Sequence, residues 1–389
     1  MPGSLVEPVE TDVGVVAGPG SLVEPVETNA SVLAGPGSLV EPVETSVGVL
    51  AGPGSLVEPV ETNVTVASDP VIVVVDGGGT KTDVIVLGLD GRVLAGHRAG
   101  AFIPQFIGPG PAARELNAVV SPLLRAFNDP PVAVAGVYFS GLDFAFEVEA
   151  FRAELGRFGW ASQTLLVDND VFALMRVGTD EPTAVAVVCG TGMNCIGRGA
   201  TGEVVRFAAL GDVSGDWGGG ASLGHAALWH AARAADGRGP ATALEPLVLR
   251  ALGCATMAEV IEGYHTQRLP EDGIPGLAPL IFEAAGGGDE AALGVVGRQA
   301  DELVAFARAA IVRLGVLDQP CPVVLGGGVI AARDPLLLAA IEERLAKAAP
   351  LAKAVVVSAP PILGAALLAL DAVGAPAAAH ARVREALAG

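Results

Sequence analysis

Short apolar runs alternate with longer amphipathic stretches from Asp69 onwards. Residues 71–75 are five consecutive valines and isoleucines, which predict a buried strand. A second apolar and β-branched run at 83–89 ends in Asp90-Gly91, a common hairpin turn, and a third strand is expected at 92–97. Helices and strands then alternate, with a helix near 112–127, a strand at 132–139 and a helix reaching about 158. This order predicts an α/β fold.

A second unit with the same pattern begins at Ala184. A strand, the turn at 190–192, a second strand and a third strand at 203–207 repeat the opening order. Helices dominate from there to about 315, and the last helices begin near 361. The longest helix is expected to bury residues that recur at helical spacing: Leu293, Val296, Ala300, Leu303, Val304, Ala307, Ile311 and Leu314.

Three glycine turns follow predicted strands, at 77–79, 190–192 and 326–328. Glycine allows positive φ and lets backbone N–H groups approach an anion such as a phosphate. The first turn is not a Walker loop, because Thr80 precedes Lys81 and a strand follows instead of a helix. The same placement excludes the Rossmann fingerprint. A phosphate loop between two strands remains, and an ordinary hairpin turn with a capping Asp76 is its alternative.

Polar residues also follow strand ends, which is the edge where open parallel sheets bind ligands. The strand at 132–139 runs into Ser140–Asp143. A short strand at 165–167 ends in Asp168-Asn169-Asp170, and a helix is expected to begin at once.

Residues 1–68 have a different composition. The unit PGSLVEPVET starts at Pro2 and recurs at positions 19, 36 and 53, without a basic or aromatic residue in the segment. With two prolines per unit and no aromatic anchor, we predict an acidic, disordered tail and assign it no chemistry. A strand solenoid is the alternative, although a proline inside each unit disfavours it.

Composition narrows the class of partner. The 389 residues are 51% hydrophobic, enough for more than one domain, and the net charge is -20. This charge argues against nucleic acid and anionic membranes as partners, and no apolar run reaches the length of a membrane span. Polyphosphate would have to be bound by backbone and a metal ion. The four cysteines contain no C-x-x-C pair, and a reduced cytoplasm is the simplest compartment.

The motifs DGGGTKTD, DNDVFAL, VVCGTGMN and VLGGGVI occur in this order. From about 71 to 374 the chain resembles the BadF/BadG/BcrA/BcrD-type ATPase family, and within it the N-acetylglucosamine kinases of the sugar kinase, actin and heat-shock ATPase superfamily. The resemblance implies two ribonuclease-H-like, actin-like lobes with a nucleotide cleft between them. The first lobe would span 69–182 and be joined by helices at 361–389, and the second would span 183–360.

The cofactors implied by the resemblance are ATP and Mg²⁺, and Asp76 would hold the metal ion. The turn residues expected to contact the phosphates are Gly78, Gly79, Thr80, Lys81, Thr191 and Gly192. Gly327 and Gly328 would lie against the adenine. An exposed hairpin lysine is the alternative for Lys81, and a helix-opening turn is the alternative for the last two glycines.

A sugar hydroxyl needs a base within hydrogen-bond reach. The resemblance assigns this role to Asp170, with a helix N-cap as the alternative, whereas Asp168 is expected to be structural. The sugar-binding residues implied by the family are Gln105, Asp143, Asn169, Asn194 and Asp216. The sequence departs from the family at Ile103–Phe106 and at Leu210, where animal enzymes carry a tryptophan. Trp217 is either a substitute stacking surface or a core residue.

The predicted reaction is therefore ATP-dependent phosphorylation of an amino sugar, first N-acetylglucosamine to N-acetylglucosamine 6-phosphate. Glucosamine, glucose and N-acetylmuramic acid are alternative substrates. An ATP-hydrolysing activator or switch protein of the BadF type is the alternative from another class, although Cys189 and Cys195 lie too close to the second glycine turn to hold its iron–sulfur cluster. The expected partner is a small sugar, and a homodimer is one assembly we consider.

Overall fold

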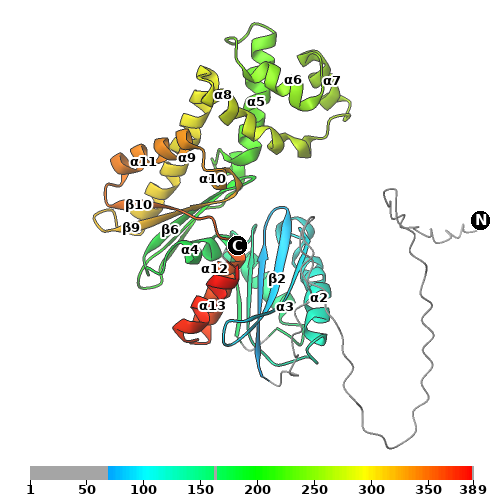
Figure 1. The fold of residues 1–389 in the computed structure, drawn as a ribbon, viewed down its shortest axis with the longest axis vertical. Coiled ribbons are helices and arrows are strands. Elements are labelled where there is room, and N and C mark those ends of the chain that lie inside the picture. The colour runs from blue at the N-terminus through cyan, green and yellow to red at the C-terminus, as the bar shows by residue number, and fades with distance from the viewer. Residues whose placement is uncertain (1–68, 162–163, 388–389) are drawn as a thin grey trace, which may run out of the picture. The chain divides into compact units, whose positions relative to one another are not determined.

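The structure is a computed structural model that describes residues 69–161 and 164–387 (Figure 1). The predictions made for residues 1–68 lie outside this described part. Two five-stranded sheets form its framework. None of the helices in these two ranges is long and apolar enough to cross a membrane.

The first sheet has the strand order β3-β2-β1-β4-β5. Its strands are β1 (Val71–Gly77), β2 (Lys81–Gly88), β3 (Val93–Gly100), β4 (Val132–Phe139) and β5 (Thr164–Asn169). The first three strands are antiparallel neighbours, and β4 and β5 run parallel to β1. The central strand β1 is buried along its whole length, which explains why its sequence is continuously apolar rather than alternating.

The second sheet repeats this order as β10-β9-β6-β7-β8. Its strands are β6 (Ala184–Cys189), β7 (Met193–Arg198), β8 (Val204–Arg206), β9 (Cys321–Gly326) and β10 (Ala352–Val356). Again three strands are antiparallel neighbours, and the other two run parallel to the central one. In each sheet, the glycine turn therefore follows the carboxyl end of the central strand.

Helices cover both faces of the first sheet. On one face, α2 (Pro109–Arg125) and α3 (Ala145–Leu155) pack against Val71, Val73 and Val75. On the other face, α12 (Pro361–Ala372) and α13 (Ala377–Leu387) pack against Ile72 and Val74. The last helices of the chain thus complete the core of its first strands.

The helix α4 (Asp170–Gly178) contributes to the cores of both sheets. Its Ala173 lies in the cluster with α12, whereas Val171, Leu174 and Met175 pack against strands of the second sheet. The approach to α12 is close, because a Cβ added at Gly364 would lie 1.8 Å from the carbonyl oxygen of Ala173. Glycine is required there for the two helices to pack.

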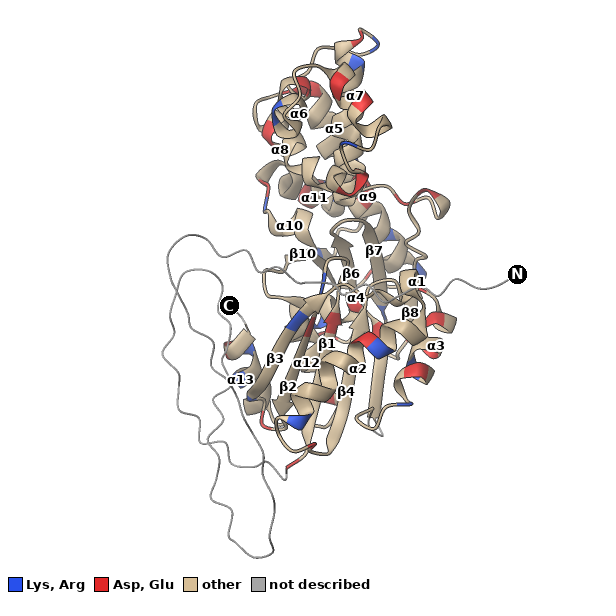
Figure 2. Ribbon diagram, turned by 90° about the vertical axis from the view of Figure 1, so that its right-hand side faces the viewer, with Lys and Arg blue, Asp and Glu red and all other residues tan. Residues whose placement is uncertain are grey.

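The second sheet carries most of the remaining helices. They are α5 (Gly219–Ala235), α6 (Leu244–Leu252), α7 (Met257–His265), α8 (Ala278–Gly286), α9 (Glu290–Arg313), α10 (Gly328–Ala331) and α11 (Pro335–Ala348). A short helix α1 (Pro104–Ile107) follows β3 of the first sheet, and two 3-10 segments, η1 (Gly211–Val213) and η2 (Glu271–Leu277), flank α5–α7. Figure 2 shows α5–α8 gathered beyond the second sheet, with Lys and Arg positions scattered along the ribbon.

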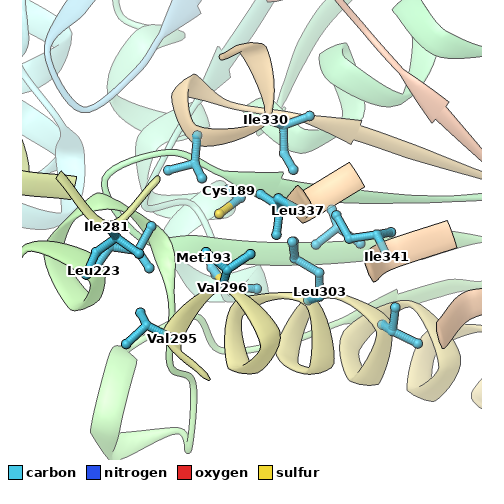
Figure 3. Close-up of a cluster of buried hydrophobic side chains, with 14 of the residues drawn as sticks. Cys189, Met193, Leu223, Ile281, Val295, Val296, Leu303, Ile330, Leu337 and Ile341 are labelled. Carbon is cyan, nitrogen blue, oxygen red and sulfur yellow. The ribbon is translucent and has the colours of Figure 1, made fainter. Parts of the chain in front are cut away.

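The buried face of α9 packs against one face of the second sheet. Figure 3 shows Val296 and Leu303 of α9 in one buried cluster with Met193 of β7, Leu223 of α5 and Leu337 of α11. The predicted apolar face of this helix is right except at its ends. The side chain of Leu293 is 39% exposed, and Leu314 is only partly buried.

The elements predicted from the hydrophobic pattern are present with shifted ends, whereas β10 and the helices α1 and α11 were not predicted. The strand at 132–139 corresponds to β4, and the strand expected before the turn at 326–328 corresponds to β9. The lobe boundaries at 182 and 360 stay a prediction.

Candidate active site

The first glycine turn joins β1 to β2. The N–H of Gly78 donates to the carbonyl oxygen of Lys81 over 2.9 Å, which closes a tight turn and leaves Gly79 and Thr80 exposed. A Cβ added at Gly77 would lie 2.2 Å from the ring of Phe139, so this position has room only for glycine. The start of the turn therefore packs against Phe139, and its tip at Gly79 and Thr80 is exposed to solvent.

The second turn lies between β6 and β7 and is tied to the start of α5. The N–H of Gly190 donates to the carbonyl oxygen of Gly192 (2.9 Å). The carbonyl oxygens of Gly190 and Thr191 accept from the N–H groups of Gly220 (2.8 Å) and Ala221 (2.9 Å). Two of the unpaired N–H groups at the helix start are satisfied in this way.

The three glycine turns meet. A Cβ added at Gly79 would lie 4.0 Å from Thr191 Oγ1, which brings the first turn next to the second. Gly327 has φ 92°, and a Cβ there would lie 2.4 Å from the carbonyl oxygen of Cys189, which brings the third turn next to the second. Gly327 also precedes the first residue of α10, so the helix-opening role proposed as its alternative is real.

Three carboxylates lie close enough to influence one another at the ends of β1, β4 and β5. Burial raises the pKa of Asp76 well above its usual value, and the charge of Asp170 raises it further. Desolvation, and then the charge of Asp143, raises the pKa of Asp170 to about 7. Desolvation and Glu147 raise the pKa of Asp143 to about 6, against the hydrogen bonds from Asn194 and Asn169. Near neutral pH this site is poised to exchange protons.

Two amides, one from each sheet, converge on a single oxygen of Asp143. Asn169 Nδ2 donates to Asp143 Oδ1 over 2.9 Å, and Asn194 Nδ2 of β7 donates to the same atom over 2.8 Å. Asn169 is fully buried, and its Oδ1 accepts from the N–H of Val171 over 3.0 Å. Asn169 therefore caps α4, and the alternative of Asp170 as the N-cap is wrong, since Asp170 is the first residue of the helix.

The structure places the other predicted sugar residues on loops. Gln105 is exposed on α1, and a Cβ added at Gly141 would lie 2.9 Å from its Oε1, so Gln105 borders the loop that ends in Asp143. Asp216 is partly buried and accepts from the hydroxyl of Ser214. None of the hydrogen bonds among the described residues joins Gln105 or Asp216 to the Asp143 group.

Lys81 and Trp217 both have protein partners. Lys81 Nζ lies 2.8 Å from Asp83 Oδ2, and Arg98 Nε lies 2.6 Å from Asp83 Oδ1, so Asp83 is held by two cations. The Lys81 side chain is still 41% exposed and accessible to a phosphate. Trp217 packs against the core of the second sheet, and the guanidinium of Arg298 lies 3.9 Å from its ring centroid.

Two residues near the site were missed from the sequence. Arg206 Nη2 of β8 lies 2.7 Å from Asp168 Oδ1 and 2.9 Å from Asp168 Oδ2, which forms an ion pair between the sheets. This pair agrees with the structural role expected for Asp168. Glu147 Oε2 accepts from the N–H groups of Asp143 and Phe144 at 2.9 and 3.0 Å. Neither residue lies in a glycine turn or at a strand end with other polar residues, so no local pattern marked them.

The carboxylates fit a magnesium ion. Mg²⁺ prefers oxygen ligands and is commonly held by one or two carboxylates, with water and phosphate oxygens completing its shell. Asp76 is 7% exposed and has a raised pKa, and a cation beside it would offset the cost of its charge. Across the residues that the structure describes, there is no cluster of three or more His, Cys, Asp or Glu side chains suited to holding a metal by themselves. The fit is thus to an ion shared with a polyphosphate.

Two sheets with one strand order, with their glycine turns meeting beside a group of carboxylates, define the two-lobed nucleotide-binding fold of sugar kinases and actin. A solved structure with this fold is that of a candidate N-acetylglucosamine kinase from Chromobacterium violaceum, with a TM-score of 0.58 and 25% identity over 78% of this chain and 100% of that one. The present chain belongs to the BadF/BadG/BcrA/BcrD ATPase family, whose model matches residues 73–369.

Two curated relatives are kinases by name. An N-acetyl-D-glucosamine kinase of Dictyostelium discoideum is 26% identical over 316 residues, which cover 78% of this chain and 99% of the relative. An N-acetylmuramic acid/N-acetylglucosamine kinase of Clostridium acetobutylicum is 24% identical over 271 residues, covering 67% of this chain and 85% of the relative. Both matches extend over most of the relative's length.

Proposed function

We propose that this protein is an ATP-dependent kinase that phosphorylates an amino sugar, with N-acetylglucosamine as the first candidate and its 6-phosphate as the product. Membership of an ATPase family supports the use of ATP. The names of the two kinase relatives support an amino sugar as the acceptor.

The observation that carries the proposal is the position of Asp170, which is the first residue of α4 and close enough to feel the charge of the Asp143 carboxylate, itself fixed by two amides. A primary hydroxyl is a weak nucleophile at neutral pH and reacts faster when a base removes its proton. Because its pKa is about 7, Asp170 is partly ionised at neutral pH and is basic enough to accept that proton. It lies at the start of α4, where Asn169 holds the helix end in place.

The acceptor would bind against Asp143. Two amides fix the Asp143 carboxylate through Oδ1, which leaves its orientation defined before substrate arrives. A carboxylate held in this way accepts hydrogen bonds from sugar hydroxyls without a free-energy cost of reorientation. Asn169 and Asn194 would border this subsite, while Gln105 and Asp216 would approach the sugar from the loops at 104–107 and 211–216.

ATP would lie where the glycine turns meet. The backbone N–H groups of the first two turns would bind the phosphates through Gly78, Gly79, Thr80, Lys81, Thr191 and Gly192. Gly327 and Gly328 would let the adenine approach the backbone, and Asp76 would hold the magnesium ion. Magnesium, when bound, would neutralise charge on the transferring phosphoryl group.

The deciding experiment is ADP release measured in a coupled assay with N-acetylglucosamine, glucosamine, glucose and N-acetylmuramic acid, each with and without Asp170→Asn. We expect release that requires a sugar, is fastest with N-acetylglucosamine, and is lost in the variant while nucleotide binding remains. Mass spectrometry and ³¹P NMR of the product would check that the 6-hydroxyl carries the phosphate. ADP release without any sugar would instead support an ATP-hydrolysing switch protein.

Two further parts of the proposal concern the cellular compartment and the oligomeric state. We place the reaction in the cytoplasm, where ATP is available, and cell fractionation would check this. A homodimer is the assembly we would test first, by light scattering of the purified protein.

A further inference from the structure

One buried polar side chain lies outside the site described above. Among the described residues, the other buried polar side chains belong to the first hairpin or to the Asp143–Asn169 pair: Asp76, Thr82, Asp83, Asp143 and Asn169. The exception is Gln299, in the middle of α9, with none of its surface exposed. Its neighbours on the helix face are apolar core residues. A buried amide in an apolar core is costly unless it is hydrogen-bonded.

The partner of Gln299 is the first turn of α5. Gln299 Oε1 accepts from the N–H of Gly219 over 2.9 Å, and Gln299 Nε2 donates over 3.1 Å to Met193 Sδ, a weak acceptor. The N-cap residue of α5 is Gly218, which has no side chain to cap the helix. The amide of Gln299 therefore supplies, from α9, an acceptor for the N–H of the first residue of α5, one of the donors that a helix start leaves without a partner inside the helix.

No side chain at the N-cap itself would fit. Gly218 has φ 135°, and a Cβ there would lie 2.1 Å from Met193 Sδ. Gly219 has φ 75°, and a Cβ there would lie 2.6 Å from the carbonyl oxygen of Gly192. The turn is made of glycine because it passes directly beside the second glycine turn, and the N–H of Gly219 has its acceptor outside the turn, on Gln299.

The turn connects two functional segments. Before it lies the loop that carries Asp216, and after it come the N–H groups of Gly220 and Ala221, which bind the carbonyl oxygens of Gly190 and Thr191. Gln299 thus fixes the junction between the segment proposed to contact the sugar and the turn proposed to contact the phosphates.

We propose that Gln299 is a positioning residue, which caps α5 from a neighbouring helix and so holds the second glycine turn in its phosphate-binding conformation. This inference rests on the proposed function, in which the second glycine turn binds the phosphates of the nucleotide. Binding of Mg·ADP tests it without the sugar reaction. Gln299 does not touch the substrates. It acts through Gly219.

The test is calorimetric titration of Mg·ADP into the full chain carrying Gln299→Met or Gln299→Glu. Met preserves the side-chain length but removes the acceptor, so we expect binding to weaken about tenfold, the equivalent of one lost hydrogen bond. Glu keeps an acceptor oxygen for Gly219, and we expect it to restore affinity to within about threefold of the unmodified chain, a change below 1 kcal/mol. In the kinase assay, Gln299→Met should raise KM for ATP more than it lowers kcat.

A matched control is Ile311→Val, on the same buried face of α9 but near its far end. It should lower the thermal unfolding midpoint without changing Mg·ADP affinity. The proposal is overturned if Gln299→Met binds Mg·ADP normally, if Gln299→Glu weakens binding as much as Gln299→Met, or if affinity simply follows the unfolding midpoint across all three. Should Gln299→Met fail to fold, Gln299→Asn withdraws the acceptor by one methylene and tests the same contact. A chain that binds Mg·ADP with this pattern but phosphorylates no sugar would refute the kinase alone.

Discussion

Replacing Asp170 by Asn should make the protein more stable while it abolishes the reaction. Desolvation and the charge of Asp143 raise the pKa of Asp170 from 3.8 to about 7 in the folded protein. Between these two pH values the unfolded chain has lost the proton while the folded chain keeps it, so stability falls as the pH rises. Above pH 7 the carboxylate is charged in both states, and the loss of unfolding free energy caused by its burial is complete.

The magnitude follows from the two pKa values. The folded and unfolded pKa values differ by roughly three pKa units, and each unit corresponds to about 1.4 kcal/mol. The charge of Asp170 therefore lowers the unfolding free energy by up to about 4 kcal/mol at pH 8. At pH 5 only the first part of the transition has occurred, and the cost is about 1–2 kcal/mol. The asparagine side chain has the same shape and no charge. The gain in unfolding free energy of Asp170→Asn over the unmodified chain should therefore be roughly 2–3 kcal/mol larger at pH 8 than at pH 5.

Urea unfolding followed by tryptophan fluorescence at the two pH values would measure this difference. Asp289→Asn is a matched control, because hydrogen bonds from the N–H groups of Ala292 and Ala243 outweigh burial and lower the pKa of Asp289. The stability that its carboxylate provides is lost only below pH 3.8, so the effect of Asp289→Asn should be equal at pH 5 and pH 8.

Two results would refute the reasoning about Asp170. If Asp170→Asn gains no more stability at pH 8 than at pH 5, the carboxylate is not held at an elevated pKa. If sugar-dependent ADP release persists in the variant, another group acts as the base. In the unmodified chain, kcat should rise with pH as Asp170 ionises, with a midpoint near 7.

The remaining predictions concern the contact between the sheets, the second glycine turn and the metal. A double-mutant cycle with Asp168→Asn and Arg206→Met in urea should give a coupling energy of about 1–2 kcal/mol, and a value near zero would mean that the ion pair contributes nothing. Gly219→Ala should weaken Mg·ADP binding by at least about tenfold, because the Cβ would strike the carbonyl oxygen of Gly192, 2.6 Å away, at a φ that alanine adopts poorly. Gly253→Ala, with φ 65° but open space around it, should lower stability and leave ADP affinity unchanged. EDTA should stop ADP release and added Mg²⁺ should restore it; release that continues in EDTA would contradict the metal proposal.

The hydrophobic pattern predicted most of the framework because the central strands are buried on both faces. A strand such as β1 must be apolar at every position, and a run of this kind is visible without any knowledge of its neighbours. The strand β10 was missed because it lies at the edge of the second sheet. Its residues are only partly buried, Lys353 is exposed, and the strand is only five residues long.

The site was predicted only where its residues stand in a recognisable motif. Asp143, Asn169 and Asn194 were each expected near the sugar, but their convergence on one oxygen depends on how two sheets pack. The sequence could not predict that Asn169 rather than Asp170 caps α4, since either side chain suits the N-cap position. Arg206 and Gln299 act across the structure from elements without a motif, and their partners are far away in the sequence.

The packing of α12 on the first sheet has a consequence for the order of folding. The side chains of Ile72 and Val74 are covered by α12 and α13, which are synthesised long after β1. Until then, one face of the first sheet exposes valine and isoleucine to water, although its strands are already present. Contacts between such distant segments slow folding, and uncovered strands favour aggregation. Growing chains should therefore depend on chaperones until α12 arrives, and loss of the C-terminal helices should harm solubility more than loss of any surface loop.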